Sequence, residues 1–180
     1  MSRARSALSA AEYAILGVLR ERPMHGYEIA RRFAADLDLG LVLPLDMSTV
    51  YALLKDLQEQ GLIAGQRVTV GARPPRTVFH LLPEAEALLL QWLEEPVGRL
   101  REVRSDLLLK LYFCRRIDTA CTARLLDAQI EVCRAYLTRL ERLAADSPPG
   151  SFERLVWDSK VSAARATVAW LAEERARAGG

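Results

Sequence analysis

Helical and strand patterns follow one another in an informative order between Leu8 and Pro96: three helices, a two-stranded ribbon and a fourth helix. The tip of the ribbon carries arginines and no acidic residue. This order is typical of a winged helix-turn-helix, in which the third helix enters a DNA groove and the ribbon forms the wing. We therefore expect a mainly α fold with a small two-stranded β-wing, followed by an α-helical dimerisation domain.

The three helices have recognisable start and stop signals. The first is expected over 9–22, because its initial serine can cap the helix and is followed three residues later by a glutamate. Pro23 ends it, and a second amphipathic helix is expected from about 25 to a glycine at position 40. The third begins at Ser48, or alternatively at Asp46, and ends at a glycine that suits a helix C-terminus.

The ribbon is predicted from two stretches rich in strand-forming residues, 62–70 and 77–82. The loop between them contains two prolines together with Arg73 and Arg76. Pro83 then occupies the first position of a fourth helix, where its missing N–H is tolerated. Basic side chains at the ribbon tip are suited to the minor groove or to the phosphates beside it.

A proline and a glycine around Val97 mark the predicted boundary between a DNA-binding domain, 1–96, and a helical dimerisation domain, 97–180. In the last helix, apolar or small residues recur in alternating steps of four and three, which is heptad spacing. We expect this first seam to contact a partner subunit: Phe152, Val156, Ser159, Ala163, Ala166 and Trp170. We expect a second seam to contact the same chain: Trp157, Val161, Ala164, Val168 and Leu171.

Composition restricts the class of protein. The net charge is only +2, but up to Leu82 there are ten basic and eight acidic residues, against fifteen of each afterwards. Cys114, Cys121 and Cys133 lack CxxC spacing and a neighbouring histidine, so we expect buried free thiols rather than a disulfide or a zinc site, and no cofactor or metal. No segment approaches the roughly 20 apolar residues of a membrane span, and we expect a cytoplasmic protein.

Several segments resemble the PadR family of bacterial transcriptional regulators. They are Glu12–Gly17, Pro23–Ile29, Ser48–Leu57 and Gly61–Ile63, with weaker similarity at Asp106–Lys110 and Asp158–Lys160. The resemblance implies a homodimeric winged-helix repressor that a small molecule or another signal releases from its operator. It places Tyr27, Ser48, Thr49, Tyr51 and Lys55 on the DNA-facing side and Arg73 and Arg76 in the wing.

The chain departs from the family pattern at the reading helix, where Ser48 replaces a usual glycine and Ala52 a usual proline. The base preference of the family therefore cannot be transferred. Residues near the N-terminus of a reading helix reach base edges first, which makes Ser48, Thr49 and Ala52 the candidates for reading sequence. Lys55 and Tyr27 are the candidates for phosphate contacts.

Other functions compete with operator binding. The acids Asp56 and Glu59 on the open face of the third helix favour a winged-helix protein-protein interaction module without DNA affinity. Tryptophans near the dimer seam suit a small aromatic or hydrophobic effector. An enzyme is the least favoured class, because His25 is accompanied by neither a nucleophile nor a paired carboxylate, and no phosphate-binding glycine loop is present.

Overall fold

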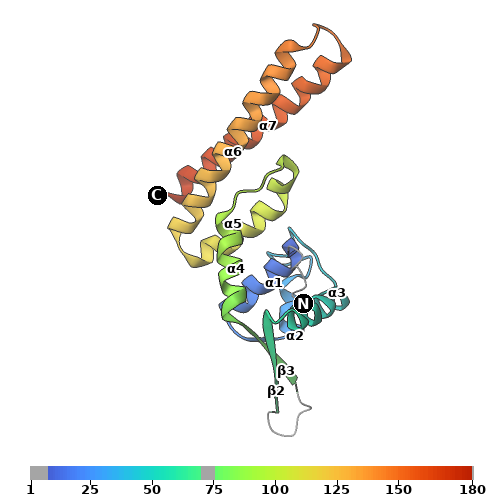
Figure 1. The fold of residues 1–180 in the computed structure, drawn as a ribbon, viewed down its shortest axis with the longest axis vertical. Helices are drawn as coiled ribbons and strands as arrows, with labels where there is room; N and C mark the ends of the chain where they lie inside the picture. Colours follow the sequence, from blue (N-terminus) through green and yellow to red (C-terminus); the bar gives the residue numbers. More distant parts are fainter. Residues whose placement is uncertain (1–7, 70–75, 180) are drawn as a thin grey trace, which may run out of the picture. The chain divides into compact units, whose positions relative to one another are not determined.

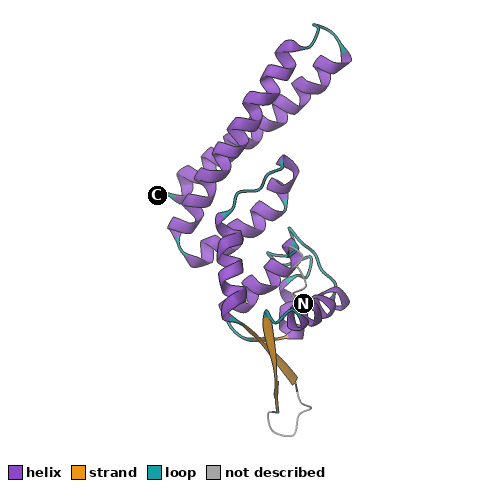
Figure 2. Cartoon of the chain, viewed as in Figure 1, coloured by secondary structure: helices purple, strands orange, loops and turns teal. Residues whose placement is uncertain are grey.

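The computed structural model describes residues 8–69 and 76–179, which form helices and one small sheet (Figures 1 and 2). The elements are α1 (Ala10–Glu21), β1 (Met24–His25), α2 (Gly26–Arg32), α3 (Met47–Glu59), β2 (Ile63–Val68), β3 (Arg76–Leu81), α4 (Pro83–Glu94), the 3-10 helix η1 (Leu100–Arg104), α5 (Asp106–Ile117), α6 (Thr119–Asp146) and α7 (Phe152–Ala178). The predicted fold class, mainly α with a β-wing, is confirmed.

The chain divides into two compact units, one up to Trp92 and one from Leu93 onward. The boundary predicted from the sequence, after Pro96, lies a few residues beyond this division. In the second unit, Lys110 Nζ donates a hydrogen bond to the carbonyl of Glu95, the residue after α4, at 2.6 Å. Val97 is likewise held by the side chain of Gln129.

The helices of the first unit are fixed by the predicted local signals. Ser9 accepts a hydrogen bond from the backbone N–H of Glu12, whose carboxylate accepts one from the N–H of Ser9, so the capping box is present. Asp46, and not the favoured Ser48, is the N-cap of α3, because its carboxylate accepts the N–H of Thr49 at 2.7 Å. Gly61 follows α3 with a φ of +71°, as a helix-ending glycine should.

The second helix is shorter than predicted. It ends at Arg32, and the chain turns back at Phe33 instead of continuing to Gly40. A side chain at Gly40 would lie 1.8 Å from the carbonyl oxygen of Ala34, so only glycine permits this close return of the backbone. Leu37, which a helix continued to Gly40 would contain, lies in the turn region and is 38% exposed.

The wing belongs to a three-stranded antiparallel sheet of order β1-β3-β2, so the prediction of two strands was incomplete. The strands β2 and β3 form the projecting ribbon (Figure 2), and β1 adds Met24 and His25 opposite Phe79 and Val78. Two residues are too few to produce an alternating pattern, and their extended conformation depends on the pairing with β3. The sheet therefore ties the start of α2 to the base of the wing.

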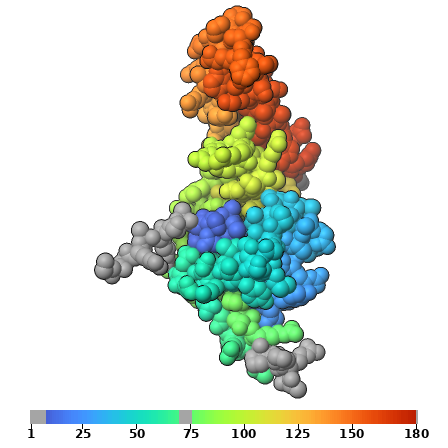
Figure 3. All heavy atoms as spheres, turned by 90° about the vertical axis from the view of Figure 1, so that its right-hand side faces the viewer, coloured from blue at the N-terminus to red at the C-terminus, as the bar shows by residue number. Residues whose placement is uncertain are grey.

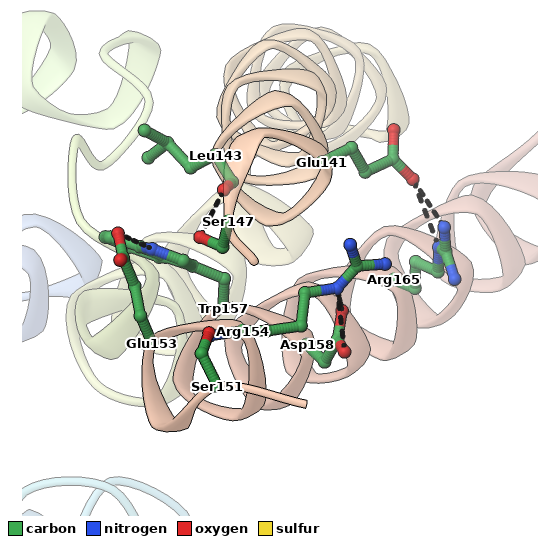
Figure 4. A network of polar contacts seen from close by, with 9 residues as sticks. All are labelled: Glu141, Leu143, Ser147, Ser151, Glu153, Arg154, Trp157, Asp158 and Arg165. Atoms are coloured by element: carbon green, nitrogen blue, oxygen red, sulfur yellow. Dashed lines mark hydrogen bonds and ion pairs between the residues drawn. The ribbon is translucent and has the colours of Figure 1, made fainter. Parts of the chain in front are cut away.

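The second unit contains the long hairpin of α6 and α7, which lie side by side along their lengths (Figures 1 and 3). Ser151 caps α7, and Arg165 of α7 donates to Glu141 of α6 at 2.7 Å (Figure 4). The buried residues Val161 and Ala164 pack against α6. The second predicted seam of α7 thus provides its intramolecular contact.

Two of the three cysteines differ from the prediction. All three are buried, but Cys114 and Cys121 form a disulfide, and only Cys133 is free. The turn at Asp118 between α5 and α6 brings the two Cα atoms to 5.2 Å, a normal distance for a disulfide. This proximity arises because Cys114 lies in the last turn of α5 and Cys121 in the first turn of α6, which spacing along the sequence does not reveal.

Candidate nucleic-acid interface

Three of the predicted DNA-facing residues line one concave surface in the first unit. Tyr27 lies at the start of α2, Tyr51 on the open face of α3 and Arg76 at the first position of β3. The hollow encloses about 770 Å³, and its other lining residues are His25, Gly26, Glu28, Thr77 and Phe79. Residues from three separate segments are therefore collected where a helix and a wing could meet a single ligand.

Glycine at position 26 shapes this hollow. A Cβ atom there would lie 2.7 Å from Cε1 of Tyr51, so the tyrosine ring packs directly on the glycine backbone. Tyr51 is nevertheless 45% exposed. The ring therefore packs on the protein with one side and is presented to solvent on the other.

Two polar contacts connect α2 to the wing and the preceding turn. His25 Nδ1 lies 3.2 Å from the carbonyl oxygen of Thr77 in β3, and the His25 N–H donates to Glu28 at 3.0 Å. The backbone N–H of His25 lowers the pKa of Glu28 below its usual value, and the guanidinium of Arg22 assists. The hollow therefore contains a carboxylate that stays ionised alongside the basic Arg76.

The start of α3 presents a short polar edge. Ser48 and Ala52 are exposed and Thr49 is half-buried. The Ser48 hydroxyl donates to the Asp46 carboxylate at 2.6 Å, and this bond, with the Thr49 N–H, lowers the pKa of Asp46. Because the Ser48 proton is engaged, its oxygen is best placed to accept a hydrogen bond from a base.

The basic side chains of α2 and α3 differ in how firmly ion pairs hold them. Lys55 is exposed and lies 3.7 Å from Glu59, a surface ion pair that holds the ammonium only weakly. Arg32 is tied to Glu21 at 2.9 Å and so links α1 to α2. The predicted wing residue Arg73 lies outside the described residues.

Arg67, in β2, is a wing cation in addition to the predicted Arg73 and Arg76. It is exposed in β2 directly opposite Thr77. Residues that face each other across antiparallel strands point to the same side of the sheet, so Arg67 shares the side of Thr77, which lines the hollow. The pairing of β2 with β3 is therefore the signal that identifies Arg67. Gly26 and His25 are further residues of the hollow that were not among the predicted DNA-facing residues.

Four of the six residues in the first seam of α7 are exposed. Phe152 is 79% exposed, and Ser159, Ala163 and Ala166 are exposed as well, whereas Val156 and Trp170 are half-buried.

No helix of the described ranges, 8–69 and 76–179, has the length and apolarity that crossing a membrane requires. No cluster of three potential metal ligands occurs in the same described ranges.

Both parts of the chain are similar to known protein families. Residues 15–87 match the family model "Transcriptional regulator PadR-like family", and residues 103–177 match "Virulence activator alpha C-term". The "Negative transcriptional regulator PadR" of Bacillus subtilis (strain 168) is 29% identical over 147 residues, which cover 78% of this chain and 79% of that protein.

Two solved structures are also similar to the chain. Bacillus subtilis PadR in complex with operator DNA is 26% identical, with coverage of 94% of this chain and 99% of that one and a TM-score of 0.46. Bacillus subtilis PadR in complex with p-coumaric acid is 25% identical, with coverage of 98% and 99% and a TM-score of 0.42.

Proposed function

Because the chain belongs to the PadR-like family of transcriptional regulators, we propose that it is a homodimeric, sequence-specific repressor that binds double-stranded operator DNA. The observation that carries this proposal is the single hollow shared by Tyr27, Tyr51 and Arg76. The name of the Bacillus subtilis relative, a negative regulator, supports repression over activation. Chromosomal DNA as the partner also implies a cytoplasmic location.

In this proposal α3 enters the major groove with its N-terminus foremost. Ser48 accepts a hydrogen bond from a base, and the methyl groups of Thr49 and Ala52 meet a thymine methyl. These contacts carry little discrimination, because none is a bidentate pair of the kind worth roughly 1–3 kcal/mol. Part of the sequence preference therefore comes from the shape and flexibility of the DNA.

The phosphate contacts come from side chains around that helix. Tyr27 donates a hydrogen bond from its hydroxyl to a phosphate. Lys55 leaves its weak ion pair with Glu59 to reach another phosphate, and the wing contributes Arg73 and Arg76. Leaving an exposed ion pair costs less than about 1 kcal/mol, so the pair with Glu59 does not prevent the lysine from reaching DNA. Affinity should fall steeply with salt because bound phosphates release counterions.

Two copies would bind through the dimerisation seam of α7: Phe152, Val156, Ser159, Ala163, Ala166 and Trp170. A twofold dimer presents two reading helices to successive major grooves, which matches an operator of pseudo-palindromic sequence. The open state of this seam, next to a second seam already packed on α6, supports an intermolecular role.

We also propose that a small aromatic or hydrophobic effector releases the operator. A phenolic acid is the first class to test, since the Bacillus subtilis PadR structure holds p-coumaric acid. Two of the tryptophans already make ring contacts within the chain. Trp92 stacks on Tyr13 with the ring centroids 4.7 Å apart, and the Lys160 ammonium lies over the ring of Trp157. Titration of the protein-operator complex with such acids should lower the bound fraction; no change at millimolar acid would refute this part.

The test of DNA binding uses fluorescence anisotropy with a DNA fragment from the region upstream of the protein's own gene. Substitution of Tyr51 and Lys55 by alanine should abolish binding. Lys160→Ala is the matched control, because it removes the same charge from an exposed lysine in the second unit. If the Lys160 variant loses as much affinity as the double variant, the assigned interface is wrong.

A protein-protein interaction module is the second candidate. The open face of α3 carries the exposed acids Asp56 and Glu59, and Lys55 is partly neutralised by Glu59. This candidate requires that salt-dependent DNA affinity is absent. An enzymatic role is disfavoured because the similar proteins reported above are transcriptional regulators.

A further inference from the structure

The disulfide between Cys114 and Cys121 lies directly beneath an exposed turn. Cys114, in the last turn of α5, is 0% exposed, and Cys121, in the first turn of α6, is 6% exposed. Residues 118–120, which join the two helices, are all exposed. Helix ends open at a lower free energy than helix centres, so a brief opening of this turn brings both sulfurs within reach of a small reagent.

Hydrogen bonds hold the same turn independently of the sulfurs. The backbone N–H of Asp118 donates to the carbonyl of Cys114 at 3.1 Å, and the Asp118 carboxylate accepts the N–H of Cys121. Because neither bond involves a thiol, we expect the two cysteines to stay adjacent when the disulfide is reduced. Adjacent thiols form the same bond again on oxidation, which makes the step reversible.

The third cysteine does not compete for this bond. From position 121 to position 133 along α6, a rise of about 1.5 Å per residue amounts to about 18 Å along the helix axis. Cys133 is buried there, and its sulfur accepts a contact from Gln129 Nε2 at 3.5 Å. Oxidation within the chain therefore has one disulfide product, between Cys114 and Cys121.

The two helices that the disulfide joins both hold the chain that follows α4. On α5, Lys110 lies one turn before Cys114, and its ammonium donates to the carbonyl of Glu95 at 2.6 Å. On α6, the Gln129 amide makes two hydrogen bonds to the backbone of Val97. Gln129 belongs to a buried row that runs along α6 in steps of four residues: Cys121, Leu125, Gln129 and Cys133. Because the disulfide joins α5 to α6, it restrains the spacing between the two points that hold residues 95–97.

We propose that Cys114 and Cys121 form a reversible redox site that controls operator binding through the way residues 95–97 are held. The proposal rests on the operator binding proposed above, which implies a compartment where thiols are kept reduced. Disulfides that form in that compartment are usually transient, catalytic or redox-sensing. A bond that forms and breaks with the redox state is therefore consistent with a DNA partner, whereas a permanent bond is not.

Hydrogen peroxide is the oxidant, because a small neutral molecule reaches a nearly buried sulfur more readily than a bulky disulfide does. The Cys121 sulfur, the more exposed of the two, attacks one peroxide oxygen; the O–O bond breaks, water leaves and a sulfenic acid remains. The Cys114 sulfur then attacks the Cys121 sulfur, the S–S bond forms and a second water leaves. Two thiols and one peroxide thus give one disulfide and two waters, and a dithiol reverses the step by thiol–disulfide exchange while it is itself oxidised.

The oxidised state is the one that favours DNA. With α5 joined to α6, residues 95–97 are held in one conformation, which lowers the cost of ordering the chain between the two units when DNA is bound. Reduction removes the restraint but leaves the hydrogen bonds of Lys110 and Gln129 in place. Because only part of the restraint of a disulfide is lost at the DNA, we expect the operator affinity to fall about tenfold.

Hydrogen exchange tests the site without reference to DNA. The protein is oxidised with hydrogen peroxide, one half is reduced with dithiothreitol, and mass spectrometry follows the amides of residues 95–99. The Val97 N–H should exchange at least about tenfold faster in the reduced half, and renewed oxidation should restore the slow rate. Cys114→Ser should show the fast rate with or without dithiothreitol, whereas Cys133→Ser, which keeps the pair, should respond as the unaltered protein does. Equal exchange in both halves, or no disulfide between Cys114 and Cys121 after peroxide treatment, overturns the proposal.

Fluorescence anisotropy then measures operator affinity on the same samples. The oxidised protein should bind about tenfold more tightly than the reduced protein, and Cys114→Ser should not respond to dithiothreitol. Equal affinities, or tighter binding by the reduced protein, overturn the control of DNA binding. Loss of the helical circular dichroism on reduction would show a purely structural bond and would also overturn the switch. Redox-dependent exchange at Val97 in a protein without operator affinity in either state supports the redox site and counts against the DNA-binding proposal alone.

Discussion

The side chain of Gln129 is the clearest place to test how the segment after α4 is held. Its amide pairs with both backbone groups of Val97: Oε1 accepts the N–H at 2.7 Å, and Nε2 donates to the carbonyl at 3.1 Å. Gln129 is 1% exposed and Val97 is 6% exposed, so water cannot replace these bonds. Gln129→Leu keeps a similar volume but leaves two buried backbone groups without partners.

Each unsatisfied buried group costs roughly 1–3 kcal/mol, so the loss of both partners should cost about 2–6 kcal/mol of unfolding free energy. Part of that loss is offset by the apolar surface that leucine buries, which makes the lower half of the range the expected result. Urea unfolding followed by helical circular dichroism measures the difference, provided that the slope against urea is unchanged.

The matched control is Glu131→Leu, on the same helix and exposed, where an ion pair with Arg134 at 3.1 Å is lost. A pair so exposed contributes less than about 1 kcal/mol, so this control should be nearly neutral. If Gln129→Leu costs no more than the control, the two hydrogen bonds do not stabilise this segment and the reasoning is refuted.

Three further predictions concern the wing, the cap and the disulfide. Arg73→Ala with Arg76→Ala should flatten the plot of log affinity against log salt by roughly one unit per lost phosphate contact, and an unchanged slope would remove the wing from the interface. The pKa of Asp46 is lowered in the folded protein, so its carboxylate adds stability at pH values above the usual pKa of 3.8, and this stability is lost as the pH falls through the folded pKa. The stability advantage of the unaltered protein over Asp46→Asn should therefore shrink in acid. A difference in Tm that does not depend on pH would contradict this. Reduction of Cys114–Cys121, which are seven residues apart, should cost roughly 2 kcal/mol in urea unfolding, with Cys114→Ser as the variant that no longer responds to reductant.

Local signals in the sequence were reliable where the structure itself is local. The serine and glutamate at the start of α1 form the predicted capping box, and the glycine after α3 adopts the predicted left-handed conformation. The choice between Asp46 and Ser48 was harder, because both side chains can cap a helix. The structure uses both: the carboxylate caps the helix, and the serine hydroxyl supports the carboxylate.

The candidate DNA interface was predicted by residue type and helical position, but its shape was not. No sequence pattern indicated that Gly26 supports the Tyr51 ring, or that β3 brings His25 and Arg76 to the same hollow. Such contacts join segments about 25 and 50 residues apart in the chain, and local propensity contains no information about them. The same holds for the two cysteines, which a turn between helices brings together.

The sequence by itself determined the order of the helices, the cap of α1, the wing strands and the two apolar seams of α7, because each depends on residues within a few turns of one another. The tertiary structure alone decided where α2 ends, which strand completes the sheet and which side chains share the hollow at the wing. Those outcomes depend on the packing of distant segments, where the burial of apolar surface and the pairing of buried polar groups select one arrangement among several that the local pattern allows.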